Sequence, residues 1–372
     1  MIKYLDLLKV NALYDAEIRQ AVADVLDSGW YLKGEATHRF EQHYAEYIGT
    51  RHCIGCANGL DALTLILRAY IEMGVMHEGD EVIVPANTYI ASILAITENR
   101  LVPILVEPSP DTLQIDDTLI EQAITERTRA IMIVHLYGRC AYTDRIGELC
   151  RKYDLKLIED NAQAHGCRAP QPPKGGVTGS LGHAAAHSFY PTKNLGAFGD
   201  AGAVTTNDDE LAALLRALGN YGSSRHYVFD YLGRNSRMDE LQAAILDAKL
   251  KDLDAANQRR KEIAAIYMEK VSNPLITIPQ CQRDSVYHIF PVLCTRRDQL
   301  KQYLADHGVE TEIHYPIPPH QQRCYTKSPY LLTPASPLPI TERIHREELS
   351  IPCHQAMKKE EASHVADLLN AF

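Results

Sequence analysis

The chain has 372 residues, of which 45% are hydrophobic and 23% are charged, and its formal net charge is −10. This composition is typical of a globular protein with two or three structural units. No cluster of Lys and Arg forms the basic stripe that nucleic-acid-binding proteins carry, so we expect no nucleic-acid partner. No apolar stretch approaches the length of about 18 residues that a membrane span needs, and residues 1–20 lack the apolar segment of a signal peptide. We therefore expect a cytoplasmic location and no membrane association.

The first half of the chain alternates strand-like and helix-like segments. Apolar runs predict strands over 80–86, 103–108, 129–138 and 155–162. Helical spacing predicts helices between them, over 88–100, 116–124 and 144–154. This alternation indicates βαβ units around a parallel sheet, and such sheets bind ligands at the carboxyl ends of their strands.

The second half changes character along its length. Two more strands are expected over 182–191 and 202–208, followed by a helix over 208–222. A long helical stretch covers 236–271, and its S-x-x-D start, from Ser236 to Asp239, fits a capping box. After about residue 255, a strand over 286–294, a helix over 298–308 and a Pro- and His-rich segment over 311–320 indicate a smaller α+β unit. We expect an α/β protein with a large domain over 1–250 and a small domain over 251–372, which the N-terminal segment can join.

Nine cysteines are scattered along the chain, and two of them, Cys53 and Cys56, form the motif C-I-G-C. This motif fits a redox site or half of a zinc site, but no second Cys pair or H-x3-H follows at zinc spacing. We expect all nine to be reduced thiols, and no metal site.

Lys193 stands in a loop of small residues, Y-P-T-K-N-L-G-A-F-G-D-A-G-A over 190–203. A lysine that forms a Schiff base needs an unprotonated amine, and a dry pocket lowers the pKa of a lysine. The glycines allow a ligand to approach the backbone closely. Alone, the motif also fits an ordinary surface loop.

Two further blocks carry polar groups at the ends of predicted elements. In L-K-L-I-E-D-N-A-Q-A-H-G (155–166), Asp160 is a candidate partner for a protonated pyridine nitrogen, and alternation along the strand sends Glu159 the opposite way. Gln163 is within reach of a ring hydroxyl. In C-A-N-G-L-D-A-L (56–63), Asn58 opens an apolar helix whose free N–H groups can bind phosphate. Plain helix capping explains Asp160 or Asn58 equally well when each is taken alone.

The order of five motifs resembles the nucleotide-sugar aminotransferases of the DegT–DnrJ–StrS family. The motifs are N-G-L-D-A-L, P-A-N-T-Y, E-D-N-A-Q-A-H-G, S-F-Y-P-T-K-N-L-G and N-S-R-M-D-E-L-Q-A-A. The resemblance implies fold type I, the aspartate-aminotransferase fold, and pyridoxal 5'-phosphate as cofactor. By this resemblance Lys193 would hold the cofactor as a Schiff base and shuttle the proton, Asp160 would hold the pyridine nitrogen and Gln163 the ring oxygen. Relatives with histidine in place of the lysine are dehydratases, so the lysine favours amino transfer.

The resemblance also implies how the rest of the cofactor is held. Tyr89 would stack on the ring. Asn58, Gly59, Leu60 and Ser188 would lie at the phosphate. Asn235 would reach the phosphate from the neighbouring subunit, which implies a homodimer with shared active sites.

The motifs are most similar to those of enzymes that act at C-3 of a dTDP-linked 3-keto-6-deoxyhexose. The resemblance implies L-glutamate as the amino donor and a 3-amino-3,6-dideoxy sugar for surface glycans as the product. Candidate contacts to the nucleotide-linked keto sugar are Tyr190, Tyr221, His314, Tyr315 and His320, although ordinary loop packing explains each of them equally well. The alternatives are amino transfer at C-4 of a 4-keto sugar and a non-catalytic regulatory homologue.

Overall fold

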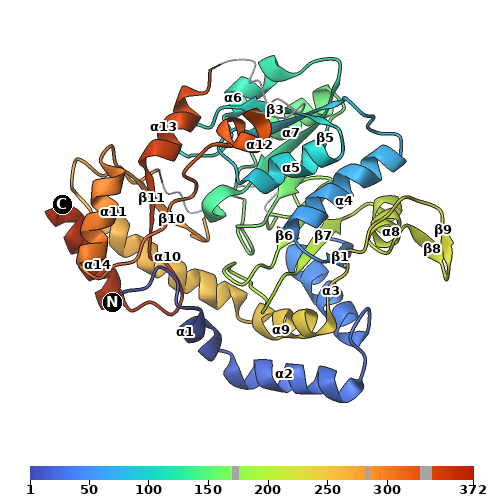
Figure 1. The fold of residues 1–372 in the computed structure, drawn as a ribbon, viewed down its shortest axis with the longest axis horizontal. Coiled ribbons are helices and arrows are strands. Elements are labelled where there is room, and N and C mark those ends of the chain that lie inside the picture. The colour runs from blue at the N-terminus through green and yellow to red at the C-terminus, as the bar shows by residue number, and fades with distance from the viewer. Residues whose placement is uncertain (170–175, 281–284, 327–336) are drawn as a thin grey trace.

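The computed structural model describes residues 1–169, 176–280, 285–326 and 337–372. Its centre is a seven-stranded sheet in the order β1-β7-β6-β5-β4-β2-β3 (Figure 1). Strand β7 runs antiparallel to both of its neighbours, and the other strands run parallel to one another. The strands are β1 (His52–Cys56), β2 (Glu81–Pro85), β3 (Val102–Val106), β4 (Thr128–Val134), β5 (Lys156–Asp160), β6 (Ala184–Ser188) and β7 (Gly202–Thr206). The expected mostly parallel sheet of a type I fold is confirmed.

Helices cover both faces of the sheet. The first half contains α1 (Leu7–Ala12), α2 (Asp15–Ser28), α3 (Glu35–Ile48), α4 (Gly59–Glu72), α5 (Ile90–Glu98), α6 (Asp117–Ile120) with η1 (Glu121–Ala123), η2 (Leu136–Gly138) and α7 (Asp144–Lys152). The second half contains α8 (Asp209–Leu218), the hairpin β8 (Ser223–Arg225) and β9 (Val228–Phe229), α9 (Glu240–Leu250), α10 (Leu253–Lys270), β10 (Phe290–Leu293), α11 (Arg297–Asp306), η3 (Pro319–Gln321), α12 (Arg323–Thr326), α13 (Pro339–Glu347), β11 (Glu348–Ile351) and α14 (Lys359–Ala371).

Alternation along the strands divides the core into two layers. Val82 and Val84 of β2 pack into the cluster beneath α4, α5 and α8, whereas Ile83 packs into the cluster on the side of α7. On β5, Ile158 lies in the first cluster and Leu157 in the second. Both faces of the sheet are therefore buried, which is why its strands read as continuous apolar runs in the sequence.

The long helical stretch is interrupted, and its expected capping box is wrong. Helix α9 begins at Glu240 after Asp239, whose side chain makes no capping hydrogen bond, and the Ser236 hydroxyl instead accepts from Ala57 N at 3.1 Å. The break lies at 251–252, because α9 packs on α2 and α3 while α10 packs on α14. One straight helix would be unable to serve both packing surfaces.

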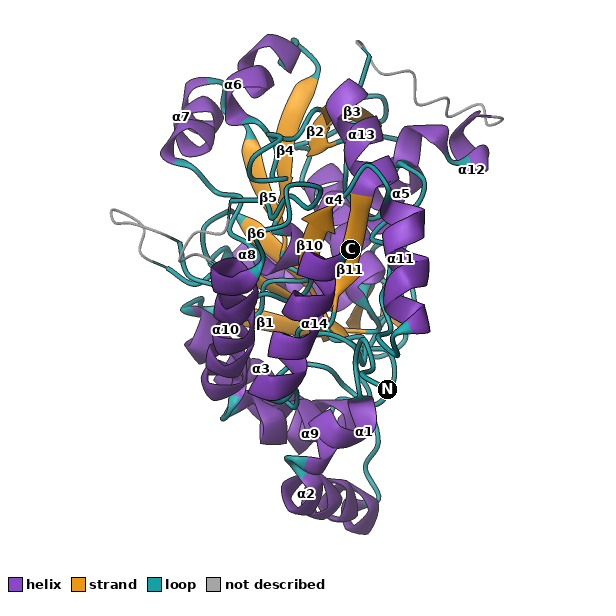
Figure 2. Cartoon of the chain, turned by 90° about the vertical axis from the view of Figure 1, so that its left-hand side faces the viewer, coloured by secondary structure: helices purple, strands orange, loops and turns teal. Residues whose placement is uncertain are grey.

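A second core surrounds the two-stranded sheet of β10 and β11 and the helices α10, α11 and α14. These elements gather on the left of Figure 1 and in front of the large sheet in Figure 2. Ile2 packs against this core, and it bridges to Val309. The domain boundary at residue 250 stays a prediction, which is supported by the start of α10 at Leu253.

No disulfide links two cysteines within the described residues, and Cys324 is the exposed one among them. Cys53 and Cys56 point into different apolar clusters on opposite sides of β1, so they serve the packing of the core. Cys281 lies outside the described residues. Within the described ranges, no group of three His, Cys, Asp or Glu side chains is arranged to bind a metal, and no helix has the length and apolar character of a membrane span.

Glu240 joins the start of α3 to α9 and carries a stability prediction. Its buried carboxylate accepts hydrogen bonds from the N–H groups of Gly34, Ala36 and Thr37, at 2.8, 2.9 and 3.1 Å. Truncation in Glu240→Ala leaves these donors without their acceptor, so we expect a loss of about 2 kcal/mol in the free energy of unfolding. Urea denaturation measures this loss, with Glu17→Ala, at an exposed position of α2, as the control. Equal midpoints for the two variants would contradict the prediction.

Candidate active site

The carboxyl end of β5 presents two carboxylates to opposite sides of the sheet, as the alternation predicts. Asp160 lies on the side of α5, where it accepts from the Ser92 hydroxyl at 2.8 Å and from Ala162 N at 3.2 Å. Burial raises the pKa of Asp160. This carboxylate has no ion-pair partner within the described part of the chain, so an apposed cation would stabilise it.

Glu159 is held on the opposite side of the sheet. It accepts from the N–H groups of Gly179, Leu181 and Gly182, each at 2.7 Å, and pairs with His135 Nε2 at 2.8 Å. Because Ala141 N donates to His135 Nδ1, the proton of this imidazole is on Nε2 and points to Glu159. All the acceptor positions of Glu159 are thus committed to the protein itself.

Lys193 stands in the loop between β6 and β7, on the same side as Asp160. Desolvation lowers the pKa of its half-buried ammonium group to about 8, although the charge of Asp160 acts in the opposite direction. Asn194 anchors the loop by donating to Asn257 Oδ1 at 2.7 Å. Lys249 of α9 donates from its Nζ to the carbonyl of Gly196. The loop is therefore fixed on both sides of an amine that is partly neutral near pH 8.

A close cradle lies where α4 begins. Asn58 caps the helix by accepting from Asp61 N at 2.8 Å. A Cβ atom on Gly59 would lie 2.5 Å from Ser188 Cβ, and one on Gly202 would lie 2.4 Å from the Asn58 carbonyl. Backbone N–H groups of the helix start and the Ser188 side chain thus meet in a space that admits no further side chain. Leu60 is half-buried at the same helix start.

Aromatic residues surround Gln163, which follows the end of β5. Gln163 Oε1 accepts from Tyr137 N at 2.6 Å, and Gln163 Nε2 donates to the Tyr315 hydroxyl at 3.0 Å. The Tyr89 ring lies 5.0 Å from the Tyr315 ring, centroid to centroid. His314 lies close enough for the charge of Lys193 to contribute to its depressed pKa, which burial chiefly lowers to about 4. The chain thus brings together residues from five separate sequence blocks.

Comparison with known proteins agrees with this arrangement. Residues 13–370 match the model of the DegT/DnrJ/EryC1/StrS aminotransferase family. The chain is 51% identical, over all of its length and 99% of the relative, to a dTDP-3-amino-3,6-dideoxy-alpha-D-galactopyranose transaminase from Aneurinibacillus thermoaerophilus.

The chain belongs to the DegT/DnrJ/EryC1/StrS aminotransferase family.

Two solved structures extend the comparison. DesV of S. venezuelae in complex with a ketimine intermediate superposes with a TM-score of 0.93 at 43% identity, and covers all of this chain and 98% of its own. NtdA of Bacillus subtilis with bound cofactor PMP has a TM-score of 0.88 at 31% identity, with 98% of this chain and 83% of its own covered. This aminotransferase uses pyridoxal phosphate.

The residues present fit this cofactor. Asp160 is a buried carboxylate, Lys193 is an amine of lowered pKa whose charge acts on it, and Gly59 opens α4, where free N–H groups of a helix start can hold a phosphate. The three features lie at one end of the large sheet. Their order and environment are those that a pyridoxal-phosphate aminotransferase needs.

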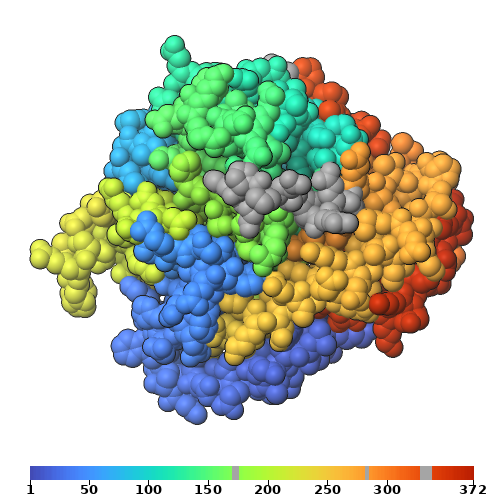
Figure 3. Space-filling view, turned by 180° about the vertical axis from the view of Figure 1, so that it is seen from behind, coloured from blue at the N-terminus to red at the C-terminus, as the bar shows by residue number. Residues whose placement is uncertain are grey.

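Other predicted contacts lie away from this cluster. Tyr190 stands three residues before the lysine, and its backbone carbonyl accepts from Lys193 N at 2.8 Å, while its side chain is about half exposed. Tyr221 and exposed Asn235 flank the hairpin β8–β9, which projects from the body of the molecule (Figures 1 and 3). His320 pairs instead with Glu342 of α13, at 3.4 Å. Within one chain of this aminotransferase, the projecting residues do not reach the lysine.

Several residues of the site were not predicted from the sequence. Ser92 stands three positions after Tyr89 in N-T-Y-I-A-S, one helical turn on, which was the available signal. His135 follows β4 directly, at the strand end where ligands of parallel sheets are expected. Ser350 and Glu348, which lie behind His314, gave no local signal.

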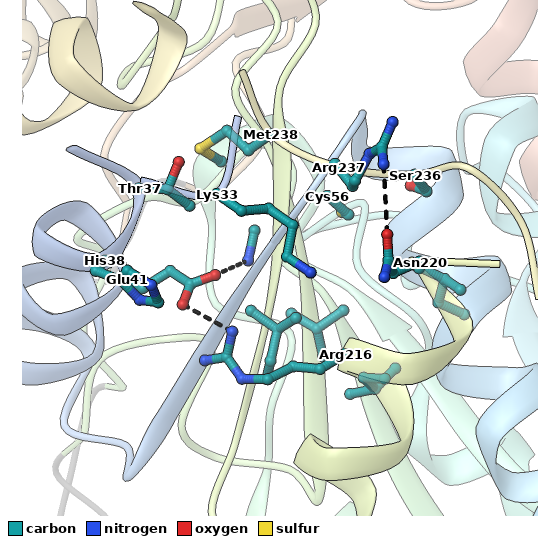
Figure 4. A pocket seen from close by; sticks show the side chains of 16 residues that line it. Lys33, Thr37, His38, Glu41, Cys56, Arg216, Asn220, Ser236, Arg237 and Met238 are labelled. Carbon is teal, nitrogen blue, oxygen red and sulfur yellow. Dashed lines mark hydrogen bonds and ion pairs between the residues drawn. The ribbon is translucent and has the colours of Figure 1, made fainter. Parts of the chain in front are cut away.

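A pocket of about 400 Å³ lies outside the cluster, and none of the predicted site residues lines it. Figure 4 shows Lys33 reaching into it, while Glu41 pairs with Arg216 at 2.9 Å. Arg237 forms part of its opposite wall and donates to Asn220. The basic residues of this pocket, Lys33, Arg216 and Arg237, are therefore separate from the cluster around Lys193.

Gly59→Ala should weaken binding of the cofactor, because the added methyl group would clash with Ser188 in the cradle. We expect the affinity for pyridoxal phosphate to fall at least about tenfold, which corresponds to about 1.4 kcal/mol. Titration followed by visible absorbance measures this. Pyridoxal without the phosphate serves as the control ligand, and an equal loss for both ligands would show that the cradle does not hold the phosphate.

Proposed function

We propose that this enzyme transfers the amino group of L-glutamate to C-3 of a dTDP-linked 3-keto-6-deoxyhexose and so forms a dTDP-3-amino-3,6-dideoxyhexose for surface glycans, in the cytoplasm. The observation that carries the proposal is the lysine of lowered pKa beside the unpaired Asp160. The relative at 51% identity, named for a dTDP-3-amino-3,6-dideoxy sugar, supports the choice of substrate.

In this proposal the chain's own side chains hold the cofactor and move one proton. Pyridoxal phosphate, when bound, supplies an electron sink that makes the proton on the substrate's nitrogen-bearing carbon removable. Asp160 would hold the pyridine nitrogen and Gln163, through the second N–H of its amide, the ring oxygen. Lys193 Nζ would carry the cofactor, take the proton in the glutamate half-reaction and return it in the sugar half-reaction. Its pKa of about 8 suits both tasks at neutral pH.

The remaining predicted residues complete the proposed site. Tyr89 would stack on the ring, and Asn58, Gly59, Leu60 and Ser188 would hold the phosphate. Asn235 would reach the phosphate of a partner subunit in a homodimer, and its exposed position beside the projecting hairpin supports this.

The sugar and its diphosphate would meet a second set of residues. Our candidates remain Tyr190, Tyr221, His314, Tyr315 and His320. Exposure of Tyr190 and Tyr221, each about half accessible, supports contact with a ligand or a partner subunit. The pairing of His320 with Glu342 makes it the weakest member of the set.

Two alternatives are separated by one experiment. Purified enzyme is incubated with L-glutamate and either a dTDP-linked 3-keto or 4-keto-6-deoxyhexose, and the products are analysed by mass spectrometry and NMR. We expect the 3-keto sugar to be aminated. Amination of the 4-keto sugar alone would overturn the C-3 assignment. A colourless protein that ignores both sugars and added cofactor would support the regulatory alternative, against which the intact pair Lys193 and Asp160 argues.

A further inference from the structure

His314 is backed by two polar side chains of strand β11. Its Nδ1 lies 2.8 Å from the Ser350 hydroxyl oxygen, and its backbone N donates to Glu348 Oε2 at 2.6 Å. The Ser350 hydroxyl in turn donates to Glu348 Oε1. Glu348 and Ser350 lie on the same face of β11 because side chains alternate along a strand. The three side chains form a continuous line of hydrogen bonds.

The hydrogen bonds fix where the protons lie. When Glu348 is ionised, above its pKa of about 8, the one hydroxyl proton of Ser350 goes to this carboxylate, so the Ser350 oxygen accepts from Nδ1–H of His314. Nε2 of the neutral imidazole is then an acceptor, and it has no partner within the described residues. This free nitrogen belongs to a side chain that lines a cavity of about 370 Å³.

The cavity that His314 lines reaches the loop that carries Lys193. Thr192, the residue before Lys193, lines the same cavity, and so does His288. The charge of Lys193 contributes to the depressed pKa of both histidines, after the larger effect of burial. Tyr137 completes the connection, because its hydroxyl donates to the His314 carbonyl at 2.7 Å while its N–H donates to Gln163.

We propose that His314, Ser350 and Glu348 form a proton relay beside Lys193, in which His314 Nε2 exchanges protons with the reacting nitrogen and oxygen of the substrates. The proposal rests on the proposed amino transfer and adds to it the group that handles the water released or consumed. His314 would be a catalytic residue, and Ser350 and Glu348 would act through it.

The exchange of a keto oxygen for an amine nitrogen conserves protons and electrons. When an amine replaces a keto oxygen, the C–O bonds break, a C=N bond forms, and the oxygen leaves as water with two protons from the nitrogen. His314 Nε2 takes up a nitrogen proton while its Nδ1 proton passes to Ser350, whose own proton passes to Glu348. The reverse shift delivers a proton to the oxygen. No net proton and no electron is exchanged with the protein.

The environment favours a relay over a charged imidazole. Burial lowers the pKa of His314 to about 4 and raises the pKa of Glu348 to about 8, which matches that of Lys193. A proton that enters at the imidazole is therefore better held on the carboxylate. The groups that act on Glu348 from neighbouring elements are Tyr4, Tyr137, Arg297, Lys301, His314 and Tyr315.

The test uses protein loaded with pyridoxamine phosphate and mixed with 2-oxoglutarate in single-turnover absorbance measurements above pH 8, where Glu348 is ionised. It therefore does not depend on which sugar is aminated. Ser350→Ala should slow the reaction at least about tenfold, with little change in the 2-oxoglutarate concentration that gives half the maximal rate and with a larger solvent deuterium isotope effect. Ser350→Thr, which keeps the hydroxyl, should restore most of the rate. Glu348→Gln should slow it like Ser350→Ala, and Ser363→Ala on α14 is the matched control.

Two results would overturn the relay. One is a rate within twofold of the unmodified enzyme for both Ser350→Ala and Glu348→Gln. The other is a loss that appears only as weaker binding of 2-oxoglutarate, with an unchanged isotope effect. Neither result would bear on the proposed amino transfer to the sugar. That proposal fails only if the unmodified enzyme aminates no 3-keto sugar.

Discussion

Lys193→Ala is expected to abolish the visible absorbance of the protein and to slow amino transfer by about 10³- to 10⁴-fold, because the variant loses both the covalent anchor and the proton carrier. The measurement is steady-state product formation together with the absorbance spectrum. Lys156→Ala, at the start of β5 on the far end of the sheet, is the matched lysine control. A Lys193→Ala variant that keeps its colour and its rate would remove the lysine from the proposed mechanism.

The pH dependence of cofactor attachment follows from the same residue. The pKa of Lys193 is lowered to about 8, so its amine is mostly protonated below that pH and mostly neutral above it. The rate at which apo-enzyme takes up pyridoxal phosphate should rise as pH increases through about 8 and then level off. A rate that rises only near the pKa of an exposed lysine, about 10.4, would contradict the buried environment.

Asp160→Asn is expected to lower the rate of amino transfer by about 10²- to 10³-fold, because a neutral amide cannot stabilise a protonated pyridine nitrogen. The folded apo-protein should respond differently. Burial raises the pKa of Asp160, so ionisation of this carboxyl group destabilises the folded apo-protein. The free energy of unfolding therefore falls as pH rises from the unfolded pKa to the folded pKa of Asp160, and the loss is complete above the folded pKa. At pH 7 the apo form of Asp160→Asn should therefore be at least as stable as the unmodified protein.

The adjacent carboxylate supplies a control of opposite sign. Burial alone would raise the pKa of Glu159, but hydrogen bonds from His135 and from the Gly179 and Gly182 N–H groups lower it on balance. Its contribution to stability is present above the unfolded pKa and is lost as pH falls through the folded pKa. Glu159→Gln should cost about 2 kcal/mol or more at pH 7. Thermal unfolding of both apo variants would contradict this account if Asp160→Asn were the less stable.

Much of the fold was predictable because its signals are local. The strands of the large sheet are apolar runs, and Lys193, Asp160 and Asn58 follow such runs or open a helix. The break between α9 and α10 was not predictable, because residues 236–271 keep helical spacing throughout and only packing against two different cores divides them. Ser236 fits a capping pattern locally but bonds to Ala57, which is distant in sequence.

The parts of the site that sequence reasoning missed depend on contacts between distant segments. His314 reads as a loop histidine until Ser350 and Glu348, more than 30 residues later, are placed behind it. Tyr221 and Asn235 show the opposite case, since the motifs placed them at the site while in a single chain they flank the projecting hairpin β8–β9. Only a complete assembly can test their proposed role.

The opposed side chains of Glu159 and Asp160 constrain how this region can change over evolution. A substitution such as Ile158→Val alters the packing of β5 but leaves both carboxylates on their own sides. Deletion or insertion of one residue inside the strand would exchange the sides, so that the hydrogen-bonded carboxylate would face Lys193 and the unpaired one would face the N–H groups. We therefore expect homologous genes to vary in the residues of this strand but to tolerate no change in its length.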